Sequence, residues 1–225
     1  MESLHQRAAG PGEHPQGARA EEGRVTVGIV DYGLGNLGSV RNMLGRIGTP
    51  TVELRTAADI AGADKVLLPG VGAFDSGVAR LKGAGLFDAL RNFAETGRPL
   101  LGICLGMQLL LDASDEGAQG GLGLIPGRST RFDESTGIRV PHMGWNFATP
   151  VRDDPLVAEL PDDSRFYFVH SYRVVPEHAE HTLATTDYGG TFASMIRAGN
   201  VMGAQFHPEK SHTFGMTILK NFATL

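Results

Sequence analysis

The single cysteine of the chain stands between two glycines, in a segment that reads Pro99-Leu-Leu-Gly-Ile-Cys-Leu-Gly-Met-Gln108. An apolar strand is predicted to end at Gly102, and a helix follows, so the flanking glycines permit a sharp strand-to-helix turn. Such a turn places the Cys104 thiol at a helix N-terminus, where the backbone dipole stabilises a thiolate. The N–H of Leu105 is then free to donate to an oxyanion. This frame favours a nucleophile over a buried structural cysteine, which is the usual role of a lone thiol.

A cysteine nucleophile needs a general base, and the base needs a group that orients it. His207 is the strongest candidate, because it follows the apolar run Val201–Phe206 and stands two residues before Glu209. A carboxylate held there could bond one imidazole nitrogen and leave the other facing Cys104. Both residues are predicted at the carboxyl ends of strands, where open α/β sheets place their sites. The alternative is a surface His-Glu pair at a strand end.

Two segments together resemble the class I glutamine amidotransferases: Gly102-Ile-Cys-Leu-Gly-Met-Gln108 and Phe206-His-Pro-Glu209. The resemblance covers the chain from about residue 25 to the end. Further segments make it closer to the glutaminase subunits of imidazole glycerol phosphate synthases: Asp31–Leu37, Pro69–Phe74, Pro141–Asn146 and Lys210-Ser211.

This resemblance implies the chemistry of the site. Cys104 would be the nucleophile, His207 the general base and acid, and Glu209 the group that orients His207. Attack on the side-chain amide of L-glutamine would give a glutamyl thioester and ammonia, and water would then release L-glutamate. The resemblance also implies three residues that bind the substrate glutamine: Gln108, Ser171 and Tyr172.

The loop after the predicted strand Lys65–Leu68 is implied to supply the second oxyanion donor, from the backbone of Gly70, Val71 and Gly72. Many relatives carry consecutive glycines in this loop, whereas this chain has Val71. A peptide flip that turns the Val71 N–H toward an oxyanion is harder with valine than with glycine. We therefore expect weak glutaminase activity until a partner and its ligand favour the flipped state.

The resemblance further implies that a second protein uses the ammonia. This chain has no room for an additional (β/α)₈ barrel, which takes about 250 residues. The expected partner is a cyclase subunit with such a barrel, in an obligate heterodimer of histidine biosynthesis that makes imidazole glycerol phosphate and an aminoimidazole carboxamide ribotide. Three residues are implied to face the partner: Asn36, Trp145 and Lys210.

Other functions compete with this interpretation. Gly33-Leu-Gly-Asn-Leu-Gly38 matches the dinucleotide fingerprint G-x-G-x-x-G, with Glu53 about 20 residues further on. A lone match is weak in a chain with 31 glycines. A non-catalytic or dinucleotide-binding module therefore stays open, as does the glutaminase subunit of another synthase. We expect no cofactor, and no metal site, because the histidines lack the spacing of metal ligands.

The elements that must position these residues follow from the apolar pattern. In the first half, apolar runs alternate with helix-like segments, which predicts a parallel sheet with right-handed crossovers. The predicted strands are Val25–Asp31, Pro50–Leu54, Lys65–Leu68 and Pro99–Ile103, and the predicted helices are Leu37–Ile47 and Leu86–Thr96.

The second half consists of short β-rich pieces, which predicts antiparallel additions to the sheet. These pieces are Arg139–Val140, Ser164–Val169, Thr182–Thr186, Thr191–Arg197 and Val201–Phe206, with a hairpin turn at Asp187–Gly190. Trp145 and His142 are expected in a loop after Val140. The last helix is expected to be capped by Ser211 and to run toward Asn221. We predict a three-layer, flavodoxin-like α/β sandwich around a largely parallel, mixed sheet.

Composition sets the remaining limits. A net charge of −5 argues against a nucleic-acid partner, which would leave a basic surface. One cysteine excludes an internal disulfide and favours a reducing compartment such as the cytoplasm. No apolar stretch reaches the length of about 18 residues that a membrane span requires. Residues 1–24 resemble neither a signal peptide nor a folded segment, so we expect a disordered extension before an amidotransferase domain at 25–225.

Overall fold

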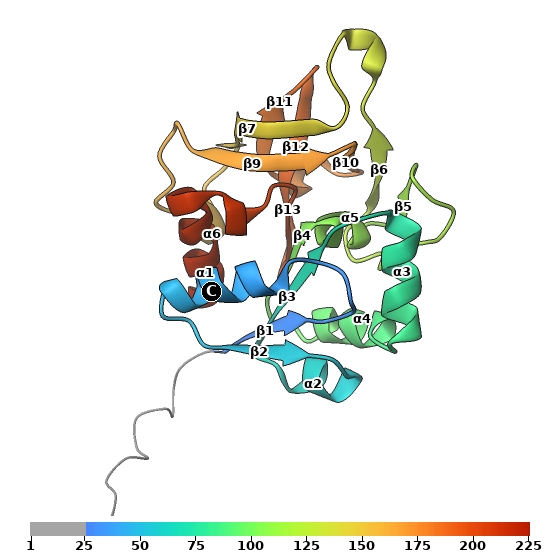
Figure 1. Ribbon diagram of the computed structural model, residues 1–225, viewed down its shortest axis with the longest axis vertical. Coiled ribbons are helices and arrows are strands. Elements are labelled where there is room, and N and C mark those ends of the chain that lie inside the picture. The colour runs from blue at the N-terminus through green and yellow to red at the C-terminus, as the bar shows by residue number, and fades with distance from the viewer. Residues whose placement is uncertain (1–25) are drawn as a thin grey trace, which may run out of the picture.

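The computed structural model describes residues 26–225, so the extension predicted at 1–24 lies outside the described residues. Within the described part, an 11-stranded sheet forms the centre of the molecule and a two-stranded sheet accompanies it. The elements of the first half alternate between strand and helix as predicted (Figure 1).

One half of the large sheet is parallel, in the order β2–β1–β3–β4–β13. Its strands are β1 (Val27–Val30), β2 (Thr51–Leu54), β3 (Lys65–Gly70), β4 (Leu100–Cys104) and β13 (Val201–Ala204). This is the flavodoxin-like order 2-1-3-4-5, with β13 as the last parallel strand. All residues of β3, β4 and β13 are buried, as expected for parallel strands covered on both faces. The carboxyl ends of β4 and β13 therefore meet at one edge of the sheet.

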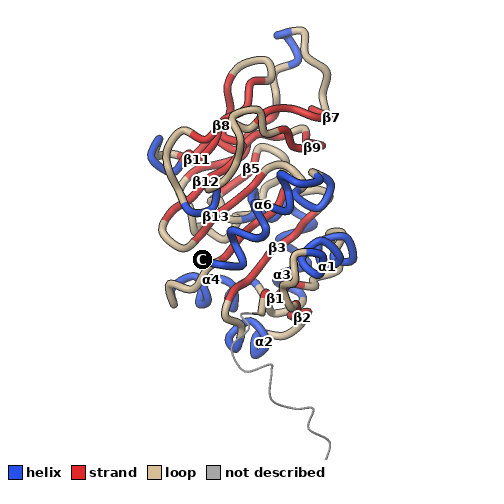
Figure 2. The backbone as a smooth tube through the Cα atoms, turned by 90° about the vertical axis from the view of Figure 1, so that its left-hand side faces the viewer, coloured by secondary structure: helices blue, strands red, loops and turns tan. Residues whose placement is uncertain are grey.

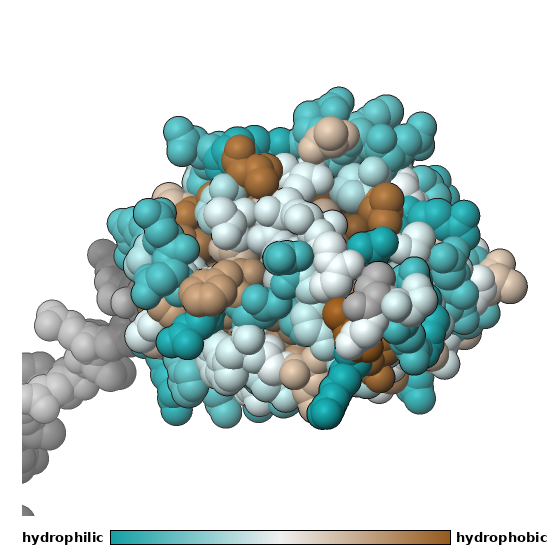
Figure 3. Space-filling view, turned by 90° about the horizontal axis from the view of Figure 1, so that it is seen from above, coloured by the Kyte–Doolittle hydropathy of each residue, from teal (hydrophilic) through white to brown (hydrophobic). Residues whose placement is uncertain are grey.

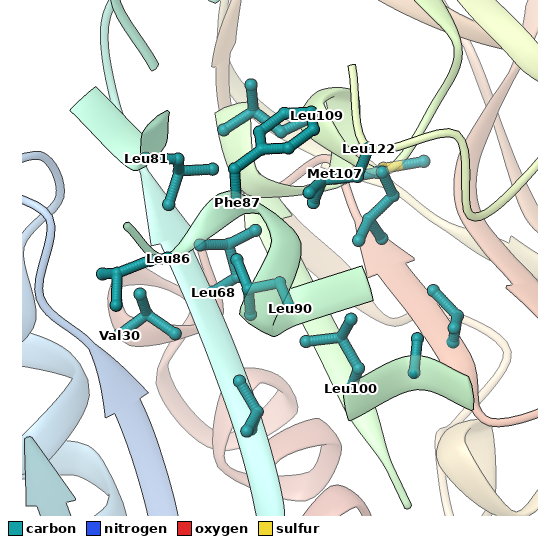
Figure 4. Close-up of a cluster of buried hydrophobic side chains, with 14 of the residues drawn as sticks. Val30, Leu68, Leu81, Leu86, Phe87, Leu90, Leu100, Met107, Leu109 and Leu122 are labelled. Carbon is teal, nitrogen blue, oxygen red and sulfur yellow. The ribbon is translucent and has the colours of Figure 1, made fainter. Parts of the chain in front are cut away.

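Helices cover both faces of this sheet, which confirms the three-layer sandwich (Figures 1 and 2). The apolar sides of α1 and α6 pack into one buried cluster, and those of α2, α3, α4 and α5 pack into another. Figure 4 shows part of the second cluster, where Leu90 lies near the strand residue Leu68, and Leu109 lies near Phe87. The helices are α1 (Leu37–Arg46), α2 (Ala57–Gly62), α3 (Phe74–Gly83), α4 (Phe87–Glu95), α5 (Leu105–Leu109) and α6 (His212–Thr224).

Antiparallel strands extend the sheet from β13, as the second half of the sequence predicts. They include β12 (Thr191–Ala198), β10 (Tyr172–Pro176), β6 (Gly127–Arg131), β11 (Thr182–Asp187) and β8 (Thr149–Pro150). At the far end, the short strand β5 (Ala113–Ser114) pairs in parallel with β6. Strands β11 and β12 form a hairpin in which Asp187 pairs with Thr191, so the predicted turn is confirmed. Strand β10 was not predicted, because the polar pair His170-Ser171 separates it from the preceding apolar run.

The two-stranded sheet corrects two sequence expectations. Arg139–Val140 is not a strand, and the segment that follows, expected as a loop, is strand β7 (His142–Phe147), which pairs with β9 (Arg165–His170). Pro141 has no N–H to donate, so strand pairing begins only after it. Gly144 interrupts the apolar pattern of β7, which hides the strand in the sequence.

Short 3₁₀ helices complete the described chain: η1 (Glu134–Thr136), η2 (Pro155–Val157), η3 (Ala179–His181) and η4 (Pro208–Lys210). Ser211 occupies the N-cap position of α6 as predicted, but its hydroxyl does not cap the helix. Instead it donates to the carbonyl of His207 at 2.6 Å and accepts the N–H of Tyr167 at 3.0 Å. Ser211 therefore joins η4 to β9.

Figure 3 looks down on the end of the molecule that carries the two-stranded sheet. Hydrophobic side chains stand apart there among hydrophilic ones. Among residues 26–225, no helix combines the length and the apolar character needed to cross a membrane.

Lys65 ties the C-terminus of the described chain to the central sheet. Its side chain is buried, and Nζ donates to the carbonyl oxygens of Ala223 at 2.6 Å and Leu225 at 2.9 Å. These carbonyls end helix α6, where no further turn of helix can satisfy them. The ammonium group therefore replaces the missing backbone donors.

Replacing Lys65 by methionine should destabilise the fold. Lys65→Met keeps the apolar stem but leaves buried carbonyls without a donor, so we expect the free energy of unfolding to fall by about 1–3 kcal/mol in urea titrations. Lys220→Met is the matched control, because Lys220 pairs with Glu159 on the surface and should contribute about 0.5 kcal/mol or less. Equal effects of the two substitutions would contradict this role for Lys65.

Candidate active site

The backbone of Cys104 makes the sharp turn that the sequence predicts. Strand β4 continues two residues past Gly102 and ends at Cys104, and helix α5 begins at the next residue. Cys104 has φ 55° and ψ −109°, a conformation that non-glycine residues rarely adopt. A Cβ at Gly106 would lie 1.9 Å from the carbonyl oxygen of Leu68, and one at Gly102 would lie 2.5 Å from that of Gly106. Both glycines are therefore required by close backbone approach.

His207 and Glu209 form a buried pair at the end of β13. His207 Nδ1 lies 2.7 Å from Glu209 Oε1, and the two side chains are only 3% and 2% exposed. Within the described chain, His207 Nε2 has no hydrogen-bond partner by distance and angle, and His207 shares a cavity with Cys104. The predicted orientation of the imidazole is thus present, with one nitrogen held by a carboxylate and the other left for the cavity.

The charges around His207 favour its protonated form. Burial lowers the pKa of His207, but the interactions with Cys104 and with Glu209 outweigh burial and raise the pKa to about 10. An imidazolium next to a cysteine stabilises the thiolate, which is the nucleophilic form. The same proton is available to a leaving group, so one residue could serve both halves of a nucleophilic displacement.

The cavity has a volume of about 340 Å³ and gathers most of the predicted substrate-binding residues. Gly70 is the exception, since it lies at the end of β3 and its Cα face packs against Leu105 and Gly106 rather than the cavity. The wall of the cavity is formed by Val71, Gly72, Cys104, Leu105, Gln108, Glu116, Pro141, Val169, His170, Ser171, Tyr172, His207 and Lys210. A larger hollow of about 820 Å³, between Thr149 and Asp162, contains none of the candidate catalytic residues.

Gln108 is fixed by hydrogen bonds that leave it facing the cavity. Its Nε2 donates to the carbonyl of Tyr172 at 3.2 Å and to Gln205 Oε1 at 3.3 Å. Gln205 is fully buried, and its Nε2 lies 3.9 Å from Cys104 Sγ. Sequence reasoning missed Gln205, although a polar residue inside the apolar run before His207 was a signal for it.

Two buried histidines support the segment that carries Ser171 and Tyr172. His170 Nδ1 lies 2.8 Å from the Tyr172 carbonyl and therefore carries a proton, so its Nε2 accepts from His142 Nδ1 at 3.0 Å. His142 Nε2 in turn accepts from Asn146 at 3.3 Å. Burial lowers the pKa of His142 to about 4 and that of His170 to about 3, which keeps both rings neutral. The sequence pattern assigned no role to His170, and these contacts explain its place.

The carbonyl oxygens of Ser171 and Tyr172 are used within the protein. The Ser171 carbonyl accepts the N–H of Phe132 at 3.1 Å, and the Tyr172 carbonyl accepts from Gln108 and His170. A ligand in the cavity would therefore meet the donors of this segment rather than its carbonyl oxygens. Donors suit an anionic group such as a carboxylate.

Two of the three predicted partner-facing residues lie together. Trp145 is 47% exposed on β7 and stacks on His212, with ring centroids 5.3 Å apart. The ring of Tyr167 lies 6.0 Å from that of Trp145 and 5.5 Å from Lys210 Nζ. Asn36 is exposed at the start of α1, a helix that contacts the η4 segment carrying Lys210, and its side chain accepts the N–H of Ser39 at 3.3 Å. Asn36 therefore stabilises the start of α1, whether or not it also contacts a partner.

The dinucleotide fingerprint has the strand–turn–helix context that the pattern requires, since it lies between β1 and α1, but two of its residues do not fit the role. A Cβ at Gly38, the third glycine of the match, would meet no atom within 4 Å, so no close backbone approach requires glycine there. Glu53 is paired with Arg41 at 3.0 Å and with Arg55 at 2.7 Å, which leaves it poorly placed to bind a ribose. No group of histidine, cysteine, aspartate and glutamate residues within 26–225 has the arrangement of a metal site.

The chain also resembles known proteins in sequence. The family model for "Glutamine amidotransferase class-I" matches residues 29–225. The chain is 47% identical to the "Imidazole glycerol phosphate synthase subunit HisH" of Bdellovibrio bacteriovorus, covering 88% of this chain and 98% of that one. It is also 47% identical to the "Imidazole glycerol phosphate synthase hisHF, chloroplastic" of Arabidopsis thaliana, covering 87% of this chain but 33% of that one.

Solved structures share the fold at lower identity. One described as "Crystal structure of glutamine amidotransferase" has a TM-score of 0.70 and 21% identity, covering 88% of this chain and 99% of that chain. "Structure of PurLQS from Thermotoga maritima" has a TM-score of 0.68 and 18% identity, covering 89% of this chain and 98% of that chain.

Removing the carboxylate of Glu209 should lower the pKa of His207. In Glu209→Gln the amide can no longer stabilise the imidazolium, so the ring should lose its proton at a lower pH than about 10. Because folding raises the pKa of His207, the protonated imidazole stabilises the folded state. This stabilisation is complete below the ordinary histidine pKa and disappears as the pH rises through about 10. Glu209→Gln should therefore lose stability mainly at neutral and acidic pH.

NMR titration of the His207 ring nitrogens measures this shift. Glu134→Gln is the control, because Glu134 pairs with Arg131 on the surface and does not itself line the cavity. An unchanged titration of His207 in Glu209→Gln would show that the carboxylate does not hold the charge.

Proposed function

This chain belongs to the class I glutamine amidotransferase family, and from that membership we propose that it is the glutaminase subunit of an imidazole glycerol phosphate synthase. It hydrolyses L-glutamine to L-glutamate and ammonia, and the ammonia serves histidine biosynthesis. The observation that carries the proposal is the cavity in which Cys104, on a strained turn, meets a histidine that Glu209 orients.

The reaction proceeds through two displacements. The Cys104 thiolate attacks the side-chain amide carbon of glutamine, and the C–N bond breaks as His207 gives its proton to the departing ammonia. The product is a glutamyl thioester on Cys104. Neutral His207 then takes a proton from water, which attacks the thioester, and the released thiolate regains its imidazolium partner. Glu209 keeps the ring oriented in both steps.

The oxyanion formed in each step needs two donors. The N–H of Leu105, the first residue after the turn, is one of them, and it comes from the cavity wall. We assign the second to the loop of Gly70, Val71 and Gly72, in which Val71 and Gly72 line the same cavity. Such donors act where the charge develops and typically contribute about 10²–10³ in rate each.

Substrate glutamine would lie along the wall opposite this loop. Gln108 contacts it from α5, and the donors of Ser171 and Tyr172 take its α-carboxylate. The His142–His170 pair supports this role, because it engages the Tyr172 carbonyl in a hydrogen bond within the protein.

The partner that we propose is a cyclase subunit with a (β/α)₈ barrel. Met143, Trp145 and Phe147 point outward from β7 and are all exposed, which gives an apolar face next to Lys210 and the cavity. Ammonia would pass from the cavity to the barrel without reaching bulk water. The Arabidopsis relative supports the pairing, since a segment like this chain makes up a third of that synthase. The need for a free thiol favours a reducing compartment, such as the cytoplasm.

Replacing the nucleophile should separate the two halves of the enzyme. In Cys104→Ala, combined with the cyclase subunit, glutamine-dependent formation of imidazole glycerol phosphate should fall to background. Synthesis from added ammonium salts should continue at the wild-type rate, because the barrel then receives ammonia from solution. Loss of both activities would mean that Cys104 supports the assembly rather than the hydrolysis.

The oxyanion loop should make hydrolysis depend on the partner. We expect the isolated chain to hydrolyse glutamine about 10²–10³ times more slowly than the complex with the cyclase and its nucleotide ligand, as for one missing oxyanion donor. Val71→Gly should raise the rate of the isolated chain, because glycine lowers the cost of the peptide flip. Full activity of the isolated wild-type chain in a glutamate-release assay would refute this expectation.

A further inference from the structure

Gln205 is a buried amide beside the nucleophile that the proposed reaction does not use. It follows β13 directly, its backbone N–H donates to the Ser194 carbonyl at 2.9 Å, and its side chain is fully buried. Burying an amide costs free energy unless both of its ends find hydrogen-bond partners. The two neighbours of this amide therefore indicate what it does.

A row of hydrogen bonds runs from a backbone carbonyl through two amides to the sulfur of Cys104. Gln108 Nε2 donates to the Tyr172 carbonyl at 3.2 Å and to Gln205 Oε1 at 3.3 Å. At the other end of the Gln205 amide, Nε2 donates to Cys104 Sγ at 3.9 Å, a long contact that the size of sulfur allows. The row joins the cavity wall at Tyr172 to the nucleophile.

The backbone carbonyl at the start of the row fixes which end of each amide faces which neighbour. A carbonyl only accepts hydrogen bonds, so the end of Gln108 that faces Tyr172 must be its NH2 group. Because the same NH2 group faces Gln205, Gln205 must present its oxygen there. The NH2 group of Gln205 is then the end that faces Cys104. Turning either amide over would bring two donors or two acceptors together, which breaks the row.

The first consequence concerns the ligand. An amide NH2 group has two hydrogens, and both hydrogens of Gln108 are used within the protein. Gln108 lines the cavity, so the polar group that it can offer to a ligand is its oxygen. An oxygen accepts hydrogen bonds and therefore suits a donor of the ligand, such as an ammonium or an amide group.

The second consequence concerns the nucleophile. The Val169 carbonyl lies 4.0 Å from Cys104 Sγ, where it can accept a thiol proton but disfavours a thiolate. The NH2 group of Gln205 is a donor, and a donor stabilises the negatively charged form of the group that it faces. Gln205 therefore favours the same form of the sulfur as the imidazolium of His207, and it does so without adding a charge to the site.

We propose that Gln205 is a positioning residue of the glutaminase site, whose amide turns the oxygen of Gln108 toward the ligand and directs an N–H at Cys104 Sγ. The inference rests on the proposed glutaminase function and deepens it. Methionine has nearly the same length and volume but neither end of the amide, so Gln205→Met separates this role from packing.

The ligand end is tested by a double-mutant cycle in the complex with the cyclase subunit and its nucleotide ligand. KM for glutamine should rise about three- to tenfold in Gln205→Met, because Gln108 loses one of the two hydrogen bonds that fix its amide. Gln108→Met should raise KM by itself. Adding Gln205→Met to Gln108→Met should change KM by no more than about twofold, because Gln205 acts on the substrate through Gln108.

The sulfur end is tested in the isolated chain without substrate. Cys104 is the only cysteine of the sequence, so alkylation by iodoacetamide reports on this residue alone. In Gln205→Met the pH at half-maximal alkylation rate should rise by about 0.5–1 unit, as for the loss of one hydrogen bond to the thiolate. The ionisable groups that interact with the sulfur or line its cavity stay the same in this variant: Tyr32, Glu116, His170, Tyr172, His207 and Lys210.

Asn221→Leu is the matched control. Asn221 is also a buried amide, and its Nδ2 donates to the carbonyls of Leu156 at 3.1 Å and Ala158 at 2.7 Å, but it does not line the cavity. Its loss should lower the melting temperature, because two carbonyls lose their donor. KM for glutamine and the pH dependence of alkylation should both stay at their wild-type values.

The outcomes are distinct. A raised KM that Gln108→Met absorbs, together with a raised alkylation midpoint, supports the inference. An unchanged KM in Gln205→Met, a double variant whose KM rises by the product of the single effects, or an unchanged alkylation midpoint overturns it. The same changes in Asn221→Leu would overturn it as well, since reduced stability would then explain them. Absence of glutamine hydrolysis in the wild-type complex overturns the proposed function itself, whereas alkylation needs no substrate and still tests the contact with sulfur.

Discussion

The site depends on one backbone conformation, the positive φ of Cys104 between strand β4 and helix α5. An L-residue adopts it only when its surroundings leave no alternative. The surroundings here are backbone atoms, because Gly106 packs closely against the Leu68 carbonyl and Gly102 packs closely against Gly106. The turn therefore costs stability, and the buried parallel strands on either side supply the rigidity that keeps it. Because the thiol lies on rigid elements rather than a loop, its partners can be placed against it with little freedom.

Those partners come from distant parts of the chain through the strand order. Strand β13 pairs in parallel with β4, so the residues after Ala204 reach the same edge as Cys104. Within this edge the His207–Glu209 pair is almost fully buried, and burial alone would discharge the imidazole. The carboxylate and the cysteine reverse that effect. A neutral pair of histidines lies on the other side of the same cavity, where burial has no opposing charge and the rings act only as hydrogen-bonding groups.

Local sequence signals predicted the parallel half of the fold and the sharp turn at Cys104, because each depends on residues that are close in the chain. The turn follows from glycines two residues either side of Cys104, and the orientation of His207 follows from Glu209 two residues later. Strand β7 was missed because Pro141 and Gly144 break its pattern, and its pairing with β9 is a distant contact. Gln205 and His170 were missed as parts of the site for the same reason. Their roles come from neighbours across the sheet, which spacing along the chain does not reveal.

The cavity and the apolar outer face of β7 belong to one connected unit. His142, the first residue of β7, stacks between the rings of Phe168 and Tyr188, with ring centroids 4.7 and 3.9 Å away. Its Nδ1 donates to His170 on β9. From His170 the contacts continue to the Tyr172 carbonyl and to Gln108. A protein bound on the face of Trp145 would therefore contact strand β7, which is linked through His142 and His170 to the cavity wall at Ser171 and Tyr172. The loop of Gly70, Val71 and Gly72, which we propose to hold the oxyanion, extends from β3 rather than from β7 or β9. Docking on the Trp145 face would thus stiffen the wall of the cavity that carries Ser171 and Tyr172, whereas the loop proposed to hold the oxyanion must be ordered by a separate set of contacts.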